Sequence, residues 1–320
     1  MKTKIFAIFL FLAMTSCYKD YIKDYDYTSI YFAYQVNVRT VVVGEGMKIE
    51  VGPAFGGEMV NSRDRQVALS LDNTLISPAT LLAMQSSSAN SIKNYVTGLA
   101  QLKLLPTDYY TISGTSVTIK KGQNSGTVVI RPDSVKFLSD PSTLMAQYVL
   151  PFRITSGDAD SIIKAKNYAV IGLRYENMLF GNYYHGGITT VKDAAGTVVK
   201  TTKYYTTIPQ ADAKVWALKT IAPNQLVTNG ISEVAGSFKL TLNGGVITVS
   251  QATGSTVVVL PTDASVYNQA KLLQNRKILL NYKYANADGT TSFAQDTLTF
   301  RNRVRDGINE WQDENPANYK

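Results

Sequence analysis

The sequence contains very few of the residues that form disulfides, metal centres and common hydrolytic sites. Its 320 residues include one cysteine, Cys17, and one histidine, His185. A single cysteine cannot form a disulfide within the chain, and a zinc or copper site built from histidine and cysteine needs about four such ligands. Catalysis by a serine or cysteine nucleophile would have only His185 as its imidazole base. We therefore predict no metal ion and no cofactor.

Long runs of one charge are also missing. The 32 lysines and arginines exceed the 24 aspartates and glutamates, which gives a net charge of +8, but they are scattered along the chain. Residues 1–16 contain Lys2 and Lys4 and no acidic residue, so removing them lowers the charge to +6. A scattered excess of this size favours solubility, and we expect no nucleic-acid partner.

The N-terminus has the pattern of a bacterial secretory signal. Lys2 and Lys4 precede the apolar run Ile5–Met14, and small residues lead into Cys17. A lone cysteine at this position indicates a lipid attachment site, so we expect residues 1–16 to be removed and Cys17 to be lipidated. Two alternatives stay open. The run could be an uncleaved anchor, although it is shorter than the roughly 20 residues that span a bilayer, or Cys17 could be a free cysteine behind an ordinary cleavage site.

The next segments predict a tether and a β-sandwich. Residues 17–28 are charged and rich in tyrosine, with no face to bury, and we expect them to link the lipid to the first domain. Residues 29–176 contain seven or eight short alternating stretches, such as Met47–Val51 and Gln66–Leu71, separated by turn sequences. This spacing predicts an immunoglobulin-like β-sandwich.

A helical pattern interrupts the sandwich. Ser77 and Pro78 form a helix start, followed by residues 79–85, and a second helical period covers residues 91–103. We predict a short helical insertion that covers an open edge or end of the sandwich.

Residues 177–320 predict a second β domain. Turn sequences separate about eight stretches with strand periodicity, which suits an antiparallel up-and-down barrel similar to a lipocalin, or alternatively a two-sheet sandwich. A barrel would leave a mouth or an interior for a ligand. The predicted strands cover residues 187–191, 197–207, 214–220, 236–242, 246–250, 256–260, 278–284 and 293–301.

Three stretches resemble a known family. Asn167–Ile171, Gly181–Tyr184 and the closing motif Asp296–Trp311 are similar to those of Bacteroidota surface lipoproteins with an N-terminal DUF1735 domain and a C-terminal DUF4361 domain. The resemblance implies a surface glycan-binding protein of a polysaccharide utilisation system. It also implies a lipid anchor in the outer membrane and an association with an outer-membrane transporter complex. The Lys19-Asp20 pair after Cys17 resembles the export signal of such lipoproteins.

Aromatic side chains are the candidate platforms for a sugar, because Trp and Tyr offer large rigid faces. The chain has 20 tyrosines and two tryptophans. The alternating run around Trp216 equally suits a core position, Trp311 could plug one end of the barrel, and His185 could be a hydrogen-bonded loop residue. The candidate platforms are Trp216, Trp311, Tyr183, Tyr184, Tyr204 and Tyr205, with His185, Asn182, Asp212 and Asn224 as polar neighbours.

These observations predict an outer-membrane-anchored, non-catalytic protein that captures an oligo- or polysaccharide for uptake. The alternative is a structural or adhesion lipoprotein that binds a protein partner in a surface complex. A glycoside hydrolase would need two carboxyl groups at a defined separation. The acidic residues near the C-terminus are expected to form a solvated tail instead: Asp306, Glu310, Asp313 and Glu314.

Overall fold

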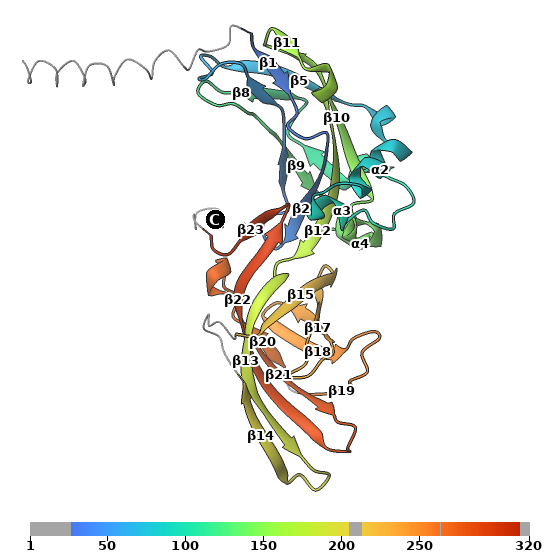
Figure 1. Cartoon of the computed structure of the whole chain (residues 1–320), viewed down its shortest axis with the longest axis vertical. Helices are drawn as coiled ribbons and strands as arrows, with labels where there is room; N and C mark the ends of the chain where they lie inside the picture. Colours follow the sequence, from blue (N-terminus) through green and yellow to red (C-terminus); the bar gives the residue numbers. More distant parts are fainter. Residues whose placement is uncertain (1–26, 205–212, 263, 314–320) are drawn as a thin grey trace, which may run out of the picture.

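The computed structural model of the protein describes residues 27–204, 213–262 and 264–313. A β-sandwich precedes a β-barrel along the chain, and the two lie at opposite ends of an elongated molecule (Figure 1). Within these described ranges, no helix combines the length and the apolar character needed to cross a membrane. The predicted signal and tether up to residue 26 lie outside the described residues, and so do Cys17, Tyr205, Asp212 and Glu314.

The N-terminal part is a β-sandwich, as predicted, and three sheets form it. The larger sheet has the order β2 (Val36–Val43), β12 (Tyr168–Asn177), β10 (Tyr148–Gly157), β5 (Arg65–Leu71) and β8 (Ser116–Ile119), with β6 (Lys103–Leu104) also paired to β10. A second sheet contains β3 (Ile49–Val51), β9 (Val128–Pro132) and β7 (Tyr110–Ile112). The third contains β11 (Ser161–Ile162), β1 (Ser29–Tyr31) and β4 (Ala54–Gly56). One apolar cluster with side chains from all three sheets forms the core.

The helical insertion exists, but it covers a face of the larger sheet rather than an edge or end. Helix α2 (Pro78–Gln85) starts as predicted, because the Ser77 side chain accepts a hydrogen bond from the Thr80 amide and Pro78 occupies the first turn. Apolar side chains of the insertion pack on the face opposite the sandwich core, which leaves β12 buried on both faces.

The second helix is shorter than predicted. Helix α3 (Asn90–Lys93) begins after Ala89, which provides no side-chain cap, and Gly98 adopts a left-handed φ of +81° that no α-helix continues. Val96 still reaches the same apolar cluster. The remaining helical turns are α4 (Lys136–Ser139) and the 3-10 turns η1 (Asn73–Leu75), η2 (Thr107–Tyr109), η3 (Pro141–Leu144), η4 (Lys164–Lys166) and η5 (Leu273–Asn275).

The C-terminal part is a closed antiparallel barrel, which confirms the barrel and not the two-sheet alternative. Its first and last strands, β13 and β22, pair from Asn182↔Asn302 to Lys192↔Thr291 and so remove both edges. The circuit consists of β13 (Gly181–Lys192), β15 (Val215–Ala222), β16 (Gln225–Thr228), β17 (Phe238–Asn243), β18 (Val246–Gln251), β20 (Ser265–Tyr267), β21 (Lys277–Ala285) and β22 (Thr291–Arg305).

Two predicted strands lie outside this circuit. Strand β14 (Val198–Tyr204) extends the sheet beside β13, and β19 (Val259–Leu260) pairs only with β21. The circuit instead uses β16 and β20, which have four and three residues, too few for an alternating pattern to be recognised in the sequence. A last short strand, β23 (Ile308–Glu310), forms a hairpin with the end of β22.

A matched pair of substitutions on α2 tests the packing of the insertion. Met84 is fully buried, whereas Leu82 on the same helix is 63% exposed. We expect Met84→Ala to lower the free energy of unfolding by about 2–5 kcal/mol, because it removes buried apolar contacts and leaves a cavity. Leu82→Ala should change it by less than about 0.5 kcal/mol. Denaturant unfolding measures both, and equal effects would contradict the packing described.

Candidate functional site

Most of the predicted sugar platforms lie inside the barrel. The rings of Tyr183, Tyr204 and Trp216 are buried, and each belongs to the inward phase of its strand. Trp216 stacks on the imidazole of His185 with 3.8 Å between ring centroids and meets Phe238 edge to face. These rings therefore offer no open face to a sugar, and the barrel interior is packed with side chains where a lipocalin-like fold could hold a ligand.

His185 does not lie in a loop, because β13 runs through it and turns its side chain into the barrel, where it is fully buried. Its Nε2 lies 3.0 Å from Oδ2 of Asp296, an ion-pair distance without hydrogen-bond geometry. Asp296 also accepts hydrogen bonds from the hydroxyls of Tyr204 and Tyr282, the latter at 2.5 Å. The inward carboxylate is thus surrounded by groups that compensate its burial.

This buried cluster is suited to holding the barrel together and not to acting on a substrate. Ser232 bonds to Tyr204 and, through its amide, to Tyr282, so its hydroxyl is not aimed at His185. Burial and the neighbouring Asp296 raise the pKa of Tyr204 and Tyr282 far above their usual values, so both phenols stay protonated donors. The hydrogen bonds to Asp296 of β22 hold the side chains of Tyr204 on β14 and Tyr282 on β21 inside the barrel.

The remaining predicted residues are on the outside of the barrel or beyond it. Tyr184 is half-buried on the outer face, with the Arg301 guanidinium 5.8 Å from its ring centre. Trp311 follows β23 and is 57% exposed, so it does not plug the barrel. Asn182 bonds to Asn302 and Asn224 to the Leu242 carbonyl. The structure therefore does not bring these residues together with the buried ones into one open site.

A polar groove of about 630 Å³ lies between the sandwich and the barrel. Glu45 of the sandwich lines this groove and forms ion pairs with Arg276 and Arg303 of the barrel at 2.7 and 2.8 Å, and all three side chains are nearly fully buried. Glu310 in turn binds Arg303 and Arg305. These ion pairs connect the two domains and neutralise one another's charge, and we call the group of Glu45, Arg276, Arg303 and Glu310 the joint.

The described acidic residues near the C-terminus are held by the protein, which corrects the predicted solvated tail. Asp306 accepts a hydrogen bond from the Thr40 amide of the sandwich at 2.9 Å, and Asp313 accepts one from the Leu273 amide of the barrel at 2.7 Å. These long-range partners cannot be recognised in the local sequence. Their carboxylates are held by backbone donors, whereas an acid and nucleophile pair would have to face a substrate.

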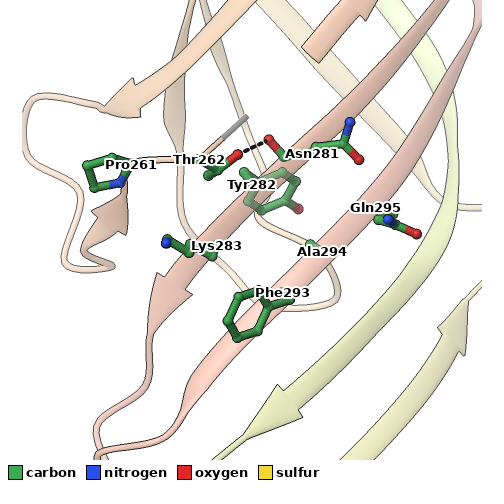
Figure 2. A pocket seen from close by; sticks show the side chains of 8 residues that line it. All are labelled: Pro261, Thr262, Asn281, Tyr282, Lys283, Phe293, Ala294 and Gln295. Carbon is green, nitrogen blue, oxygen red and sulfur yellow. Dashed lines mark hydrogen bonds between the residues drawn. The ribbon is translucent and has the colours of Figure 1, made fainter. Parts of the chain in front are cut away.

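A hollow of about 600 Å³ on the outer face of the barrel has a different character. Figure 2 shows Pro261 and Thr262, which follow β19, beside the residues of β21, with those of β22 on the next strand. The Thr262 hydroxyl donates to the Asn281 carbonyl at 2.9 Å and fixes this connection. The lining consists of Pro261, Thr262, Asn281, Tyr282, Lys283, Phe293, Ala294 and Gln295.

An aromatic ring and unpaired polar groups share this hollow. Phe293 is 37% exposed and lies directly opposite Lys283 in the β21–β22 register, with Asn281 opposite Gln295 in the next outward-facing pair. In the described part of the chain, no hydrogen bond or ion pair engages the side chains of Asn281, Lys283 or Gln295. Unlike the charges of the joint, these groups are available to a ligand.

Sequence reasoning missed this hollow, although the sequence carries a signal for it. Along residues 291–301 of β22 the inward phase is apolar at Ala294, Leu298 and Phe300, while the outward phase is otherwise polar or charged. Phe293 is an aromatic residue in that polar phase. A large apolar side chain on the solvent face of a strand is the feature that could have singled it out.

Comparison with known proteins supports the fold. A family model described as an N-terminal domain matches residues 25–161, which is less than half of the chain. No curated protein matches the sequence. A Bacteroides ovatus structure of unknown function superposes with a TM-score of 0.63 at 20% identity, over 90% of this chain and 99% of that one. This similarity shows that the fold of the whole chain also occurs in a Bacteroides protein.

Two further Bacteroides ovatus structures superpose more loosely. One is a multidomain protein that includes DUF1735, with a TM-score of 0.38 at 12% identity over 88% of this chain and 97% of that one. The other is a candidate carbohydrate-binding protein, with a TM-score of 0.29 at 13% identity over 69% of this chain and 66% of that one. No statement about this chain rests on these two, and the assignment of its C-terminal half to DUF4361 stays a prediction.

The joint predicts a specific loss of stability in acid. Burial tends to raise the pKa of Glu45, but Arg303 and Arg276 outweigh it and hold the pKa below its ordinary 4.5. A lowered folded-state pKa stabilises the fold above pH 4.5, and this contribution is lost as the pH falls through the folded value. Glu45→Gln leaves the buried Arg276 without a counter-ion and Arg303 with Glu310 alone, so we expect a cost of about 3–5 kcal/mol near neutral pH.

Thermal unfolding measured from about pH 3 to about pH 7, a range that includes the usual pKa of a carboxyl group, checks this prediction. The difference between the wild-type protein and Glu45→Gln should shrink as the pH falls below 4.5. Glu50→Gln, whose partner Lys48 is exposed, is the matched control and should have almost no effect. A difference that is independent of pH would contradict the role given to Glu45.

Proposed function

We propose that the protein is a non-catalytic lipoprotein of the outer cell surface that binds a glycan in the hollow over β21 and β22. The proposal rests on one observation, the partly exposed ring of Phe293 beside the side chains of Asn281, Lys283 and Gln295, which form no hydrogen bond or ion pair within the described residues. Sugars present an apolar C–H face and a rim of hydroxyls. An aromatic ring beside amide and ammonium groups matches both features.

The lining provides the groups that such recognition needs. The carboxamides of Asn281 and Gln295 can each donate and accept hydrogen bonds, and the Lys283 ammonium can donate three. The same strands are anchored from inside by the Asp296 cluster, so the hollow belongs to a rigid wall of the barrel. A pre-formed site loses little conformational freedom when a ligand binds.

The arrangement of the chain supports a role in capture away from the membrane. Strand β1, the first after the predicted tether, lies at the end of the molecule opposite the barrel (Figure 1). A lipid on Cys17 would therefore attach near the sandwich, and the hollow would face away from the membrane. An outer-membrane transporter complex would be the receiver of the bound glycan.

A protein partner is the second candidate, and one surface feature favours it. Val246, Val266 and Leu279 lie side by side across β18, β20 and β21, and each is more than 40% exposed. Such a row on the solvent face of a sheet could contact a neighbouring protein of a surface complex. Under this alternative Leu279, and not Phe293, would be required for function.

Removing the exposed ring tests the proposed site. We expect Phe293→Ala to weaken glycan binding at least about tenfold, equivalent to about 1.4 kcal/mol, because the stacking face is lost. Affinity electrophoresis against a panel of polysaccharides and host glycans identifies a ligand, and titration calorimetry then measures the loss.

Leu279→Ala is the matched control, because Leu279 is also exposed on β21 but does not line the hollow. It should leave the affinity unchanged. Failure of every glycan to bind, or equal binding by Phe293→Ala and the wild-type protein, would overturn the proposed site.

The lipid anchor has its own test. We expect Cys17→Ala to move the protein from the membrane fraction to the soluble fraction, because two or three acyl chains on one cysteine are what makes the attachment stable. Fractionation of cells with immunoblotting measures the distribution, and Tyr18→Phe serves as the control that keeps the cysteine. Membrane retention of Cys17→Ala would contradict the anchoring.

A further inference from the structure

Strands β21 and β22, which line the hollow, and the neighbouring β13 and β14 have an unbalanced charge. These four strands contain a single carboxylate, Asp296, and it is buried inside the barrel. Lys283 lines the hollow, and Lys192 and Lys203 lie on the neighbouring strands. We infer that the hollow selects an anionic glycan, one with carboxylate or sulfate groups on its sugars. The inference rests on the proposed function and specifies its ligand.

The strand register gathers these lysines on one face. Phe293 pairs with Thr190 of β13 and with Lys283 of β21, so these three side chains share a row on the outer surface. In the adjacent row Gln295 pairs with Ile188, and Ile188 pairs with Lys203 of β14. Paired residues of neighbouring strands point to the same face. Basic side chains therefore lie on both sides of the aromatic ring.

One lysine is in direct contact with the ring. The ammonium of Lys192 lies 4.9 Å from the centre of the Phe293 ring, a cation–π distance. No carboxylate of the described residues pairs with Lys192, Lys203 or Lys283. A ligand that stacks near Phe293 would thus meet at least one ammonium group whose charge is not neutralised by the protein.

Some lysines elsewhere on the surface have acidic partners. Ion pairs join Lys120 to Asp64 and Lys136 to Asp108, both at 2.8 Å, and Lys214 of the barrel to Glu233 at 3.1 Å. The turns at the ends of the four strands carry Asp193 and Asp288, whose carboxylates accept hydrogen bonds from amides of their own turns and form no ion pair with Lys192, Lys203 or Lys283.

The chemistry of the lining suits a carboxylate or sulfate more than a neutral sugar alone. Lysine binds such groups as a mobile point charge with three donors, and the interaction weakens as salt screens it. The amides of Asn281 and Gln295 would read hydroxyls of the same chain, and Phe293 would carry the ring. The lysine charges would favour anionic over neutral sugars, and stacking on Phe293 would restrict binding to ligands with a sugar ring.

Paired polymers test the inference with the full-length protein in detergent. Homogalacturonan and alginate are compared with their carboxyl-reduced forms, and chondroitin sulfate and heparan sulfate with forms that are both desulfated and carboxyl-reduced. We expect the tightest ligand to be one of the anionic polymers. Neutralising it should weaken binding about tenfold or more, and the difference should shrink as the salt concentration rises.

Lysine variants locate the effect. Lys283→Gln and Lys192→Gln should each weaken the anionic polymer about threefold to tenfold and leave neutral polymers unchanged. Lys219 is exposed on β15, outside the four strands, so Lys219→Gln is the matched control and should have no effect. Circular dichroism confirms that each variant is folded.

Three outcomes would overturn the inference. If the tightest ligand is neutral and Phe293→Ala abolishes its binding, the charge preference fails while the proposed function stands. If anionic polymers bind Phe293→Ala and Lys283→Gln as tightly as the wild-type protein, the attraction is a general one of a basic protein. If no polymer of any charge binds, the inference and the proposed function fail together.

Discussion

The pairing of β13 with β22 is the constraint on which the barrel depends. It joins the first and last strands of the circuit over their whole common length, so every side chain on both strands has a fixed direction. Asp296 can enter the interior only because Gly187 lies opposite: a Cβ at Gly187 would lie 2.4 Å from Oδ1 of Asp296. A glycine on one strand and a carboxylate on the other thus determine where the polar centre of the barrel forms.

The same pairing gives the two faces of these strands different roles. The inward phase holds the stacked Trp216 and His185 and the tyrosines around Asp296, and it leaves no room for a sugar. The outward phase holds Phe293, Asn281, Lys283 and Gln295, whose side chains make few contacts within the protein. Rigidity and recognition are therefore provided by alternate residues of the same two strands.

A second constraint is the buried joint between the two domains. Glu45 contributes one carboxylate to two arginines of the barrel, Arg276 and Arg303, and Glu310 of the β22–β23 hairpin also pairs with Arg303. A buried charge group of this kind is costly to break from either side, so it keeps the sandwich and the barrel in one orientation. For a protein attached at one end and binding at the other, a fixed orientation would keep the hollow turned away from the membrane.

The sequence by itself determined the mainly β character, the sandwich followed by a barrel, and the start of α2 at Ser77 and Pro78, because period and capping are local properties. It did not determine the site. Whether Trp216, Tyr183 and Tyr204 face inward depends on which strands close the barrel, and β16 and β20 are too short to be recognised locally. The position of Glu45 against Arg276 and Arg303 depends on how the domains dock, over more than 200 residues of separation. The hollow forms where Pro261 and Thr262 come close to β21 and β22, so the tertiary structure decided that the solvent-facing Phe293 has a hollow with unpaired polar groups beside it.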